Sequence, residues 1–203
     1  RQHAHRRVVQ VGPRLLPDED REAEHRGHGE RVELLGLLGD GDGERRVDAA
    51  HVVDGERLRQ SLGLHRHGVA HVEEAAGRRA YIVETDVTEE AAVTACAAAI
   101  EKQFGRVDIL FNNAGITSPK LLADLPVAEW QRVIDVNLTG AYLCARAFAP
   151  GMVARKWGRI INMGSVLSGR GMANRTVYAA TKAGLSNFGA SLAFELGPYG
   201  VTV

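Results

Sequence analysis

Val107-Asp108-Ile109-Leu110-Phe111 is a short, mostly apolar run that leads directly into Asn112-Asn113-Ala114-Gly115. An apolar run of this kind that ends in turn-forming residues indicates a buried β-strand. Comparable runs occur elsewhere, and we expect strands at 80–85, 107–111, 158–163 and from residue 201 onward. Helical patterns separate these strands, which indicates βαβ units and an α/β fold with a parallel sheet.

The segments between the expected strands carry the apolar spacing and the end signals of helices. Val93, Cys96, Ala97 and Ile100 recur at helical spacing. Thr88 is a candidate cap at the start of this helix, and Gly105 is a candidate stop. Pro126 suits the first turn of the next helix, and longer helices are expected at 138–155 and 174–196.

Polar residues follow the ends of three of the expected strands. Asp86, the segment 112–115 and Ser165 each come directly after an apolar run. In open parallel sheets ligands bind at the edge formed by the carboxyl ends of the strands. We therefore expect these residues to share one functional edge.

Tyr178 and Lys182 stand four residues apart in Tyr178-Ala179-Ala180-Thr181-Lys182, and Ser165 lies thirteen residues before the tyrosine. Positions i and i+4 share a helix face, so the ammonium is expected beside the phenol. A nearby positive charge favours the phenolate, which makes the tyrosine a usable base near neutral pH. This arrangement suits the transfer of a proton to or from a substrate oxygen.

In order and spacing, these motifs resemble those of the short-chain dehydrogenase/reductase family over residues 80–203. Asp86-Val87 resembles the family's adenine-contacting aspartate, and the segment 112–115 resembles its NNAG signature beside the cofactor cleft. The remaining matches are the segments that carry the family's catalytic residues: Asp135-Val136-Asn137-Leu138, Ile161-Asn162-Met163-Gly164-Ser165 and Tyr178-x-x-x-Lys182. Each residue alone also has an ordinary structural explanation, such as a cap or a turn, so the resemblance depends on all the motifs being in register.

The resemblance implies an NAD(P)-dependent oxidoreductase with a Rossmann-type fold, acting on a small alcohol or ketone. It implies that Lys182 lowers the pKa of Tyr178 and holds the nicotinamide ribose, while Tyr178 moves a proton and Ser165 hydrogen-bonds the substrate oxygen. It further implies that Asn137 bends its helix and holds a water that links Lys182 to solvent. The implied catalytic set is Asn137, Ser165, Tyr178 and Lys182. The implied set for NAD or NADP is Asp86, Val87, Asn113, Ala114, Gly115, Tyr178 and Lys182.

The chain also departs from the family pattern. The glycine-rich phosphate loop, T-G-x-x-x-G-x-G, is expected some fifty residues before Asp86, and nothing in residues 25–50 matches it. The residue after the second strand that selects NAD or NADP is expected to be missing as well. The chain starts at Arg1 and stops at Val203 inside an expected strand, so both ends are expected to be cut.

Residues 1–79 differ sharply in composition from the rest. Up to Ala80 the chain uses, apart from Ser61, only residue types that have codons beginning with C or G, and all eight histidines lie there. Two explanations are open: an out-of-frame translation joined to a real protein near 72–80, or a natural Arg/His-rich disordered extension. Either predicts no domain in 1–79 and a partial Rossmann domain in 80–203.

A partial domain predicts a partial sheet. Only the third to sixth strands of the doubly wound fold are expected, with an irregular or poorly ordered amino-terminal segment. The strand at 80–85 would then lack a neighbour, and one edge of the core would be open. We therefore expect this chain to fold poorly and to show impaired turnover.

The overall composition excludes several classes of partner. The formal net charge is zero, which favours neither nucleic acid nor an anionic membrane. Cys96 and Cys144 fit no metal or redox spacing and favour a reducing, cytoplasmic compartment, and the histidine pairs lack a scaffold for metal. The alternative to an enzyme is a non-catalytic fragment that co-assembles with intact homologues, since the family commonly forms tetramers through the helices that correspond here to 138–155 and 174–196.

Overall fold

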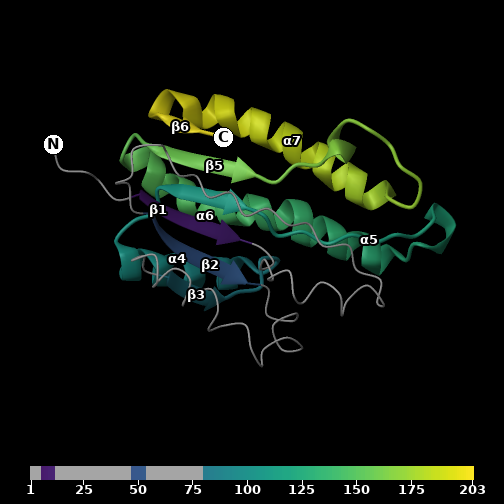
Figure 1. The fold of residues 1–203 in the computed structure, drawn as a ribbon, viewed down its shortest axis with the longest axis horizontal. Coiled ribbons are helices and arrows are strands. Elements are labelled where there is room, and N and C mark those ends of the chain that lie inside the picture. The colour runs from purple at the N-terminus through teal and green to yellow at the C-terminus, as the bar shows by residue number, and fades with distance from the viewer. Residues whose placement is uncertain (1–5, 12–46, 54–79) are drawn as a thin grey trace.

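A computed structural model describes residues 6–11, 47–53 and 80–203 and shows one parallel sheet flanked by helices. The strand order is β3-β2-β1-β4-β5-β6 (Figure 1), which is the doubly wound order 3-2-1-4-5-6. The strands are β1 Arg6–Val11, β2 Val47–Val53, β3 Ala80–Glu84, β4 Ile109–Asn112, β5 Gly158–Asn162 and β6 Val201–Thr202. The helices are α4 Glu90–Phe104, α5 Val127–Ile134, α6 Gly140–Ala154 and α7 Thr176–Leu196, with short turns η2 Leu122–Asp124, η3 Asp135–Thr139, η4 Val166–Ser168 and η5 Gly197–Tyr199.

The first two strands of the sheet come from residues 1–79, which corrects the expectation of a sheet built only from the third to sixth strands. β1 pairs with β4 and with β2, and β2 pairs with β3, so β3 has a neighbour. Arg6–Val11 and Val47–Val53 are rich in valine, and β-branched residues fit a pleated sheet. The unusual composition of the whole segment hid these two local patterns. The rest of 1–79, and the prediction that it forms no domain, lie outside the described residues.

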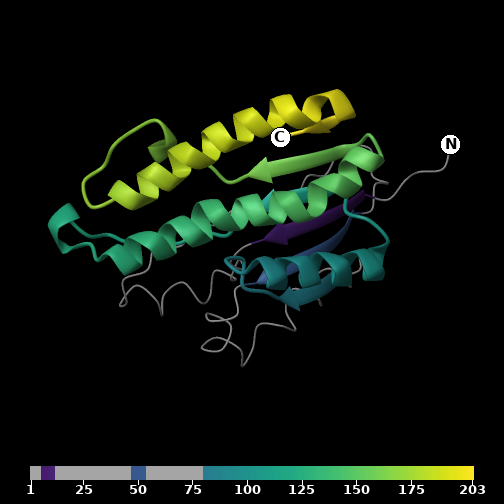
Figure 2. The same cartoon turned by 180° about the vertical axis from the view of Figure 1, so that it is seen from behind.

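Helices α4, α6 and α7 cover one face of the sheet (Figure 2). Their apolar faces and the strands form a single core in which Ile100, Leu110 and Met152 are fully buried. Val9 of β1 is 1% exposed and belongs to the same core. Gly158 is required by this packing, because a Cβ there would lie 2.5 Å from Sδ of Met152. The α/β fold predicted from the alternation of strands and helices is confirmed.

Two helix starts differ from the sequence expectation. α4 begins after Glu89, and Thr88 does not cap it; the backbone N–H and the hydroxyl of Thr88 donate instead to Oδ1 of Asp86, at 2.9 and 2.7 Å. This is an Asx-type turn, which competes with helix capping for the same side chains. Pro126 precedes the first helical residue of α5 rather than standing inside the first turn.

Helices α5 and α6 are joined without a break by η3, which has π-helical geometry. A π-turn adds a residue to the helical repeat and commonly occurs at functional sites. Asn137 lies in the middle of this turn and is 1% exposed. The helix that carries Asn137 is therefore locally irregular at that residue.

Candidate active site

The carboxamide of Asn137 is bound to the loop that follows β4. Its Oδ1 accepts from the backbone N–H of Ile116 at 2.8 Å, and its Nδ2 donates to the carbonyl of Ile116 at 2.9 Å. The two bonds to one residue fix both the position and the orientation of the amide. Nδ2 also donates to Oγ1 of Thr181 on α7, at 3.1 Å. Asn137 thus connects the β4 loop to the helix that carries Tyr178 and Lys182.

Lys182 is a buried cation at the same place. Its side chain is 3% exposed, and Nζ donates to the carbonyl of Met163, just beyond β5, at 2.6 Å. Burial lowers the pKa of the Lys182 ammonium from its ordinary 10.5 to about 8. Nζ lies 5.7 Å from the ring centroid of Tyr178, within the range of a cation–π contact. The structure therefore brings the ammonium and the phenol together, as their spacing predicts.

Gly115, on the loop after β4, lies near the side chains of Asn137 and Lys182. A Cβ on Gly115 would lie 3.6 Å from Oδ1 of Asn137 and 3.7 Å from Nζ of Lys182. A methyl group at this position would therefore be in ordinary van der Waals contact with both side chains. Lys182 has three N–H donors, and among the described residues only Met163 accepts one of them. The other N–H groups of Lys182 therefore remain available to a ligand that binds beside Gly115.

Ser165 stands at the end of β5, where it caps η4. Its Oγ accepts from the backbone N–H of Leu167 at 3.2 Å, so the hydroxyl hydrogen stays available to donate. The backbone N–H of Ser165 donates to Oγ of Ser168, which donates in turn to the carbonyl of Lys182 at 3.1 Å. These bonds hold the segment after β5 against α7, next to the turn that carries Tyr178.

The other expected cofactor residues lie along the same edge of the sheet. Asp86 is exposed at the end of β3, with Oδ1 engaged by Thr88. Val87 is buried against the start of α6, where a Cβ on Gly140 would lie 3.0 Å from its Cγ2. Asn113 and Ala114 are half-buried and follow β4 directly. All of them therefore lie at carboxyl ends of strands.

A family model for short chain dehydrogenases matches residues 58–203, which is more than half of the chain. The chain belongs to this family. Nodulation protein G of Azospirillum brasilense is 44% identical over 131 residues, covering 64% of this chain and 53% of that protein. Cis-4-hydroxycyclohexanecarboxylate dehydrogenase of Sinomonas cyclohexanicum is 43% identical over 129 residues, covering 63% of this chain and 52% of that protein. The chain thus spans about half the length of the relatives it matches.

A solved structure supports the same family, and a second one supports the fold. A metagenomic short-chain oxidoreductase in complex with NADP is 35% identical, with a TM-score of 0.67 over 76% of this chain and 67% of that one. A NAD+-bound xylitol dehydrogenase is 21% identical, with a TM-score of 0.73 over 100% of this chain and 69% of that one. The second likeness shows the fold alone.

The short-chain dehydrogenase pattern is incomplete at the phosphate-binding end. In a Rossmann-type fold the glycine-rich turn follows the first strand. Because β1 ends at Val11, this turn belongs near residue 12 rather than in 25–50. The sequence there is Gly12-Pro13-Arg14-Leu15-Leu16, which is not T-G-x-x-x-G-x-G. An acidic residue, Asp54, does follow β2 directly, contrary to the expectation that this position is missing. Residues 12–16 and 54 lie outside the described residues.

Several residues of the site carry no signal of their own in the sequence. The backbone groups of Ile116 and Met163 hold Asn137 and Lys182, and any residue type supplies such groups. Thr181 and Ser168 provide side-chain bonds, but each reads as an ordinary helix or turn residue. Of these residues only Thr181 could have been found from the sequence, by a search for a hydroxyl residue between Tyr178 and Lys182.

Neither a membrane span nor a metal cluster occurs in the part of the chain that the structure describes. No helix there is both long and apolar enough to cross a bilayer. No group of three His, Cys, Asp or Glu side chains there could hold a metal ion. The histidines at positions 3, 5, 65, 67 and 71 lie outside the described residues.

Proposed function

We propose that the chain carries the catalytic half of an NAD(P)-dependent oxidoreductase that interconverts a small alcohol and a carbonyl compound. The observation that carries this proposal is the convergence of Gly115, Asn137 and the buried Lys182 beside the ring of Tyr178. The names of the relatives support it, because they include a dehydrogenase and several 3-oxoacyl-[acyl-carrier-protein] reductases, among them that of Vibrio harveyi. The neighbouring structures with NADP and NAD+ support a nicotinamide cofactor.

The site residues have separate roles in the reaction, which follow from the chemistry of their side chains. The Tyr178 hydroxyl gives a proton to the substrate oxygen in reduction and takes it in oxidation, while the hydroxyl of Ser165 donates a hydrogen bond to the same oxygen. The free N–H groups of Lys182 are placed to hold a ribose hydroxyl and to keep positive charge next to the phenol. When bound, the nicotinamide supplies the hydride donor or acceptor.

The fit of the residues to the cofactor differs between its two ends. The buried Lys182 has N–H groups beyond the one that it donates to Met163, and these suit the polar ribose end of a nicotinamide nucleotide. Asp86 and Val87 are assigned to the adenine end, and Asn113 and Ala114 to the cleft wall. The glycine-rich turn that would hold the pyrophosphate is absent from the sequence after β1. We therefore expect this chain to bind NAD or NADP weakly and to turn over slowly.

The test is reduction of small ketones and β-ketoacyl thioesters by the full 203-residue chain with NADH or NADPH raised to millimolar concentration. We expect slow turnover with a high KM for the cofactor, and at least about a hundredfold lower turnover in Tyr178→Phe. Turnover that is equal in Tyr178→Phe, or absent at every concentration, would refute the proposal. Micromolar cofactor affinity would refute the expected weakness of binding.

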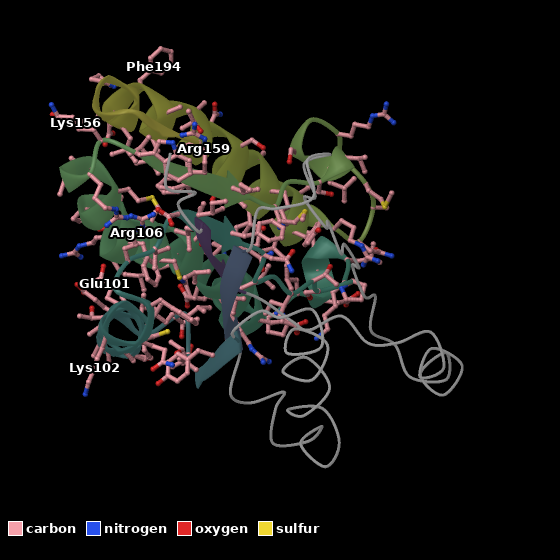
Figure 3. All side chains as sticks on the ribbon, turned by 60° about the vertical axis from the view of Figure 1, so that its left-hand side comes forward. Glu101, Lys102, Arg106, Lys156, Arg159 and Phe194 are labelled. Carbon is pink, nitrogen blue, oxygen red and sulfur yellow. The ribbon has the colours of Figure 1, made fainter. Side chains whose placement is uncertain are left out.

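A second role is favoured by the surface between α6 and α7. A groove of about 440 Å³ runs there, lined by Tyr142, Phe188 and Leu192 among others, and Phe194 projects from the end of α7 with 86% exposure (Figure 3). Family members commonly assemble through these two helices, so the chain would form a homotetramer or co-assemble with intact homologues. Size-exclusion chromatography after mixing with a full-length homologue tests this role. Mixed oligomers support it, and separate elution contradicts it.

A further inference from the structure

The hydrogen bonds of Asn137, Thr181 and Tyr178 form a chain with only one possible direction. The N–H of Ile116 can only donate and its carbonyl can only accept, so Asn137 must turn Oδ1 to the first and Nδ2 to the second. The other end of the chain is the carbonyl of Tyr178, which also can only accept. Oγ1 of Thr181 therefore gives its hydrogen to this carbonyl, at 2.8 Å, and accepts from Nδ2 of Asn137.

Burial makes each bond in this chain hard to replace. Thr181 and Asn137 are each 1% exposed, so water does not compete for their polar atoms. Loss of the threonine hydroxyl would leave the second hydrogen of Asn137 Nδ2 without an acceptor inside the protein. Such an orphaned buried group is costly, because its desolvation is no longer compensated. The Asn137 amide would then lose its link to α7 and keep only its two bonds to the Ile116 backbone, which would be less firmly held.

The chain of bonds joins the three elements that form the site. Ile116 lies on the loop after β4, Asn137 lies in the π-turn η3, and Thr181 lies on α7 between Tyr178 and Lys182. Next to Ile116 is Gly115, where an added Cβ would be in van der Waals contact with both Asn137 and Lys182. Thr181 therefore ties Asn137, and through it the loop after β4, to the helix that carries Lys182.

We propose that Thr181 is a positioning residue, which holds the Asn137 carboxamide and through it sets the loop after β4 against Tyr178 and Lys182. The effect of Thr181 on catalysis rests on the proposed function. The hydrogen-bond link from Thr181 through Asn137 to Ile116 does not rest on it. Only the hydroxyl of Thr181 takes part in this link, and its methyl group and backbone do not. Thr181→Val keeps the shape of the side chain but removes the hydroxyl, so it should break the link by leaving Asn137 Nδ2 without its acceptor.

The chain contains a matched control for this inference. Thr94 of α4 also donates its hydroxyl back to a helix carbonyl, that of Glu90, at 2.8 Å. Thr94 is exposed, so water can replace any hydrogen bond that its hydroxyl oxygen loses. Thr94→Val removes the same kind of helix bond without touching Asn137.

The test compares Thr181→Val and Thr181→Ala with Thr181→Ser and Thr94→Val in the full chain. Hydrogen exchange of the Ile116 amide reports the link directly, and kcat at saturating cofactor reports its consequence. In both non-bonding variants we expect about tenfold or greater acceleration of Ile116 exchange and a similar fall in kcat, with KM for the ketone changed less than about twofold. Thr181→Ser and Thr94→Val should match the wild type in both measurements.

The outcomes separate this inference from the proposed function. Unchanged Ile116 exchange in Thr181→Val and Thr181→Ala would overturn the inference, as would faster exchange with unchanged kcat. If only one of the two variants folds, as judged by circular dichroism, that variant decides. If the wild type shows no Tyr178-dependent turnover, the proposed function fails, and the exchange of Ile116 still decides whether Thr181 holds Asn137.

Discussion

Lys182 shows how burial and chemistry are combined at a single residue. Its ammonium is almost wholly enclosed, donates a hydrogen bond to the carbonyl of Met163, and faces the ring of Tyr178. Taking a cation out of water destabilises its charged form, which lowers the pKa of Lys182 to about 8. Strongly shifted pKa values of this kind cluster at functional sites.

The lowered pKa of Lys182 predicts a specific dependence of stability on pH. Between about 8 and the ordinary 10.5 the unfolded chain binds this proton and the folded chain does not, so stability rises with pH in that window. Below pH 8 the lysine is charged in both states and the folded protein bears the full desolvation penalty. The free energy of unfolding of the wild type minus that of Lys182→Met should therefore rise by up to about 3 kcal/mol from pH 8 to 10.5. Urea titrations of both proteins across this range measure it, and a flat difference would contradict it.

The site residues that the sequence predicts best are those that act through their side chains. Tyr178 and Lys182 are on one helix, and their spacing alone predicts that they meet. The partners of Asn137 and Lys182 could not be predicted in this way, because they are backbone groups of Ile116 and Met163. Their positions depend on how two separate elements pack.

Among the elements, the loop after β4 is held from two sides. Asn137 binds it at Ile116, and Glu129 of α5 binds it at Ser118, which is 1% exposed, and at Lys120. The hydrogen bonds from Lys120 and Ser118 lower the pKa of the Glu129 carboxyl below its ordinary 4.5. We call the contacts of Glu129 with Ser118 and Lys120 the Glu129 clamp. Glu129 lies close to the loop in the sequence, but no motif predicts this clamp.

Loss of the Glu129 charge should loosen this clamp. Because the folded-state pKa is depressed, the stability that Glu129 contributes is present above about 4.5 and is lost as the pH falls through the lower folded value. We expect Glu129→Gln to lower Tm at pH 7, with the difference from the wild type shrinking toward pH 3. Glu90→Gln is the control, since the Glu90–Arg146 pair is exposed on both sides. An equal effect of the two substitutions on Tm at pH 7 would contradict the clamp.

Elements with strong patterns are predicted well from the sequence, and irregular ones are not. The apolar run before Asn112 and the helical spacing of 174–196 lie within a few residues of β4 and α7. The π-turn at Asp135–Thr139 leaves no trace in the apolar period, because its extra residue is absorbed inside one long helix. β1 and β2 were hidden by the composition around them, although each carries several valines.

At the scale of the whole molecule, β1 is the strand on which the complete sheet depends. It lies between β2 and β4, so without it β2 and β3 would separate from the rest. Its Val9 is buried in the common core with Leu110 and Ile160. The expectation of poor folding rested on an open sheet edge, and this reason is removed by β1 and β2.

The contribution of β1 can be tested at Val9. Val9→Asp would bury an unpaired carboxylate in the core, and we expect a loss of more than about 3 kcal/mol in the free energy of unfolding. Val127→Asp makes the same change at a residue that is 82% exposed, and it should cost less than about 0.5 kcal/mol. Chemical denaturation followed by circular dichroism compares them. Equal stability of the two variants would show that residues 6–11 are not part of the sheet.

Direct evidence for hydride transfer would come from isotopic labelling, which detects even a few turnovers. The full chain is incubated with a small ketone and NADH or NADPH deuterated at the transferable position of C4, and the alcohol is examined by mass spectrometry. We expect wild-type chain to form alcohol with one deuterium on the carbinol carbon, and Tyr178→Phe to form almost none. Alcohol without the label, or equal labelled alcohol from Tyr178→Phe, would contradict an oxidoreductase site built around Tyr178 and Lys182.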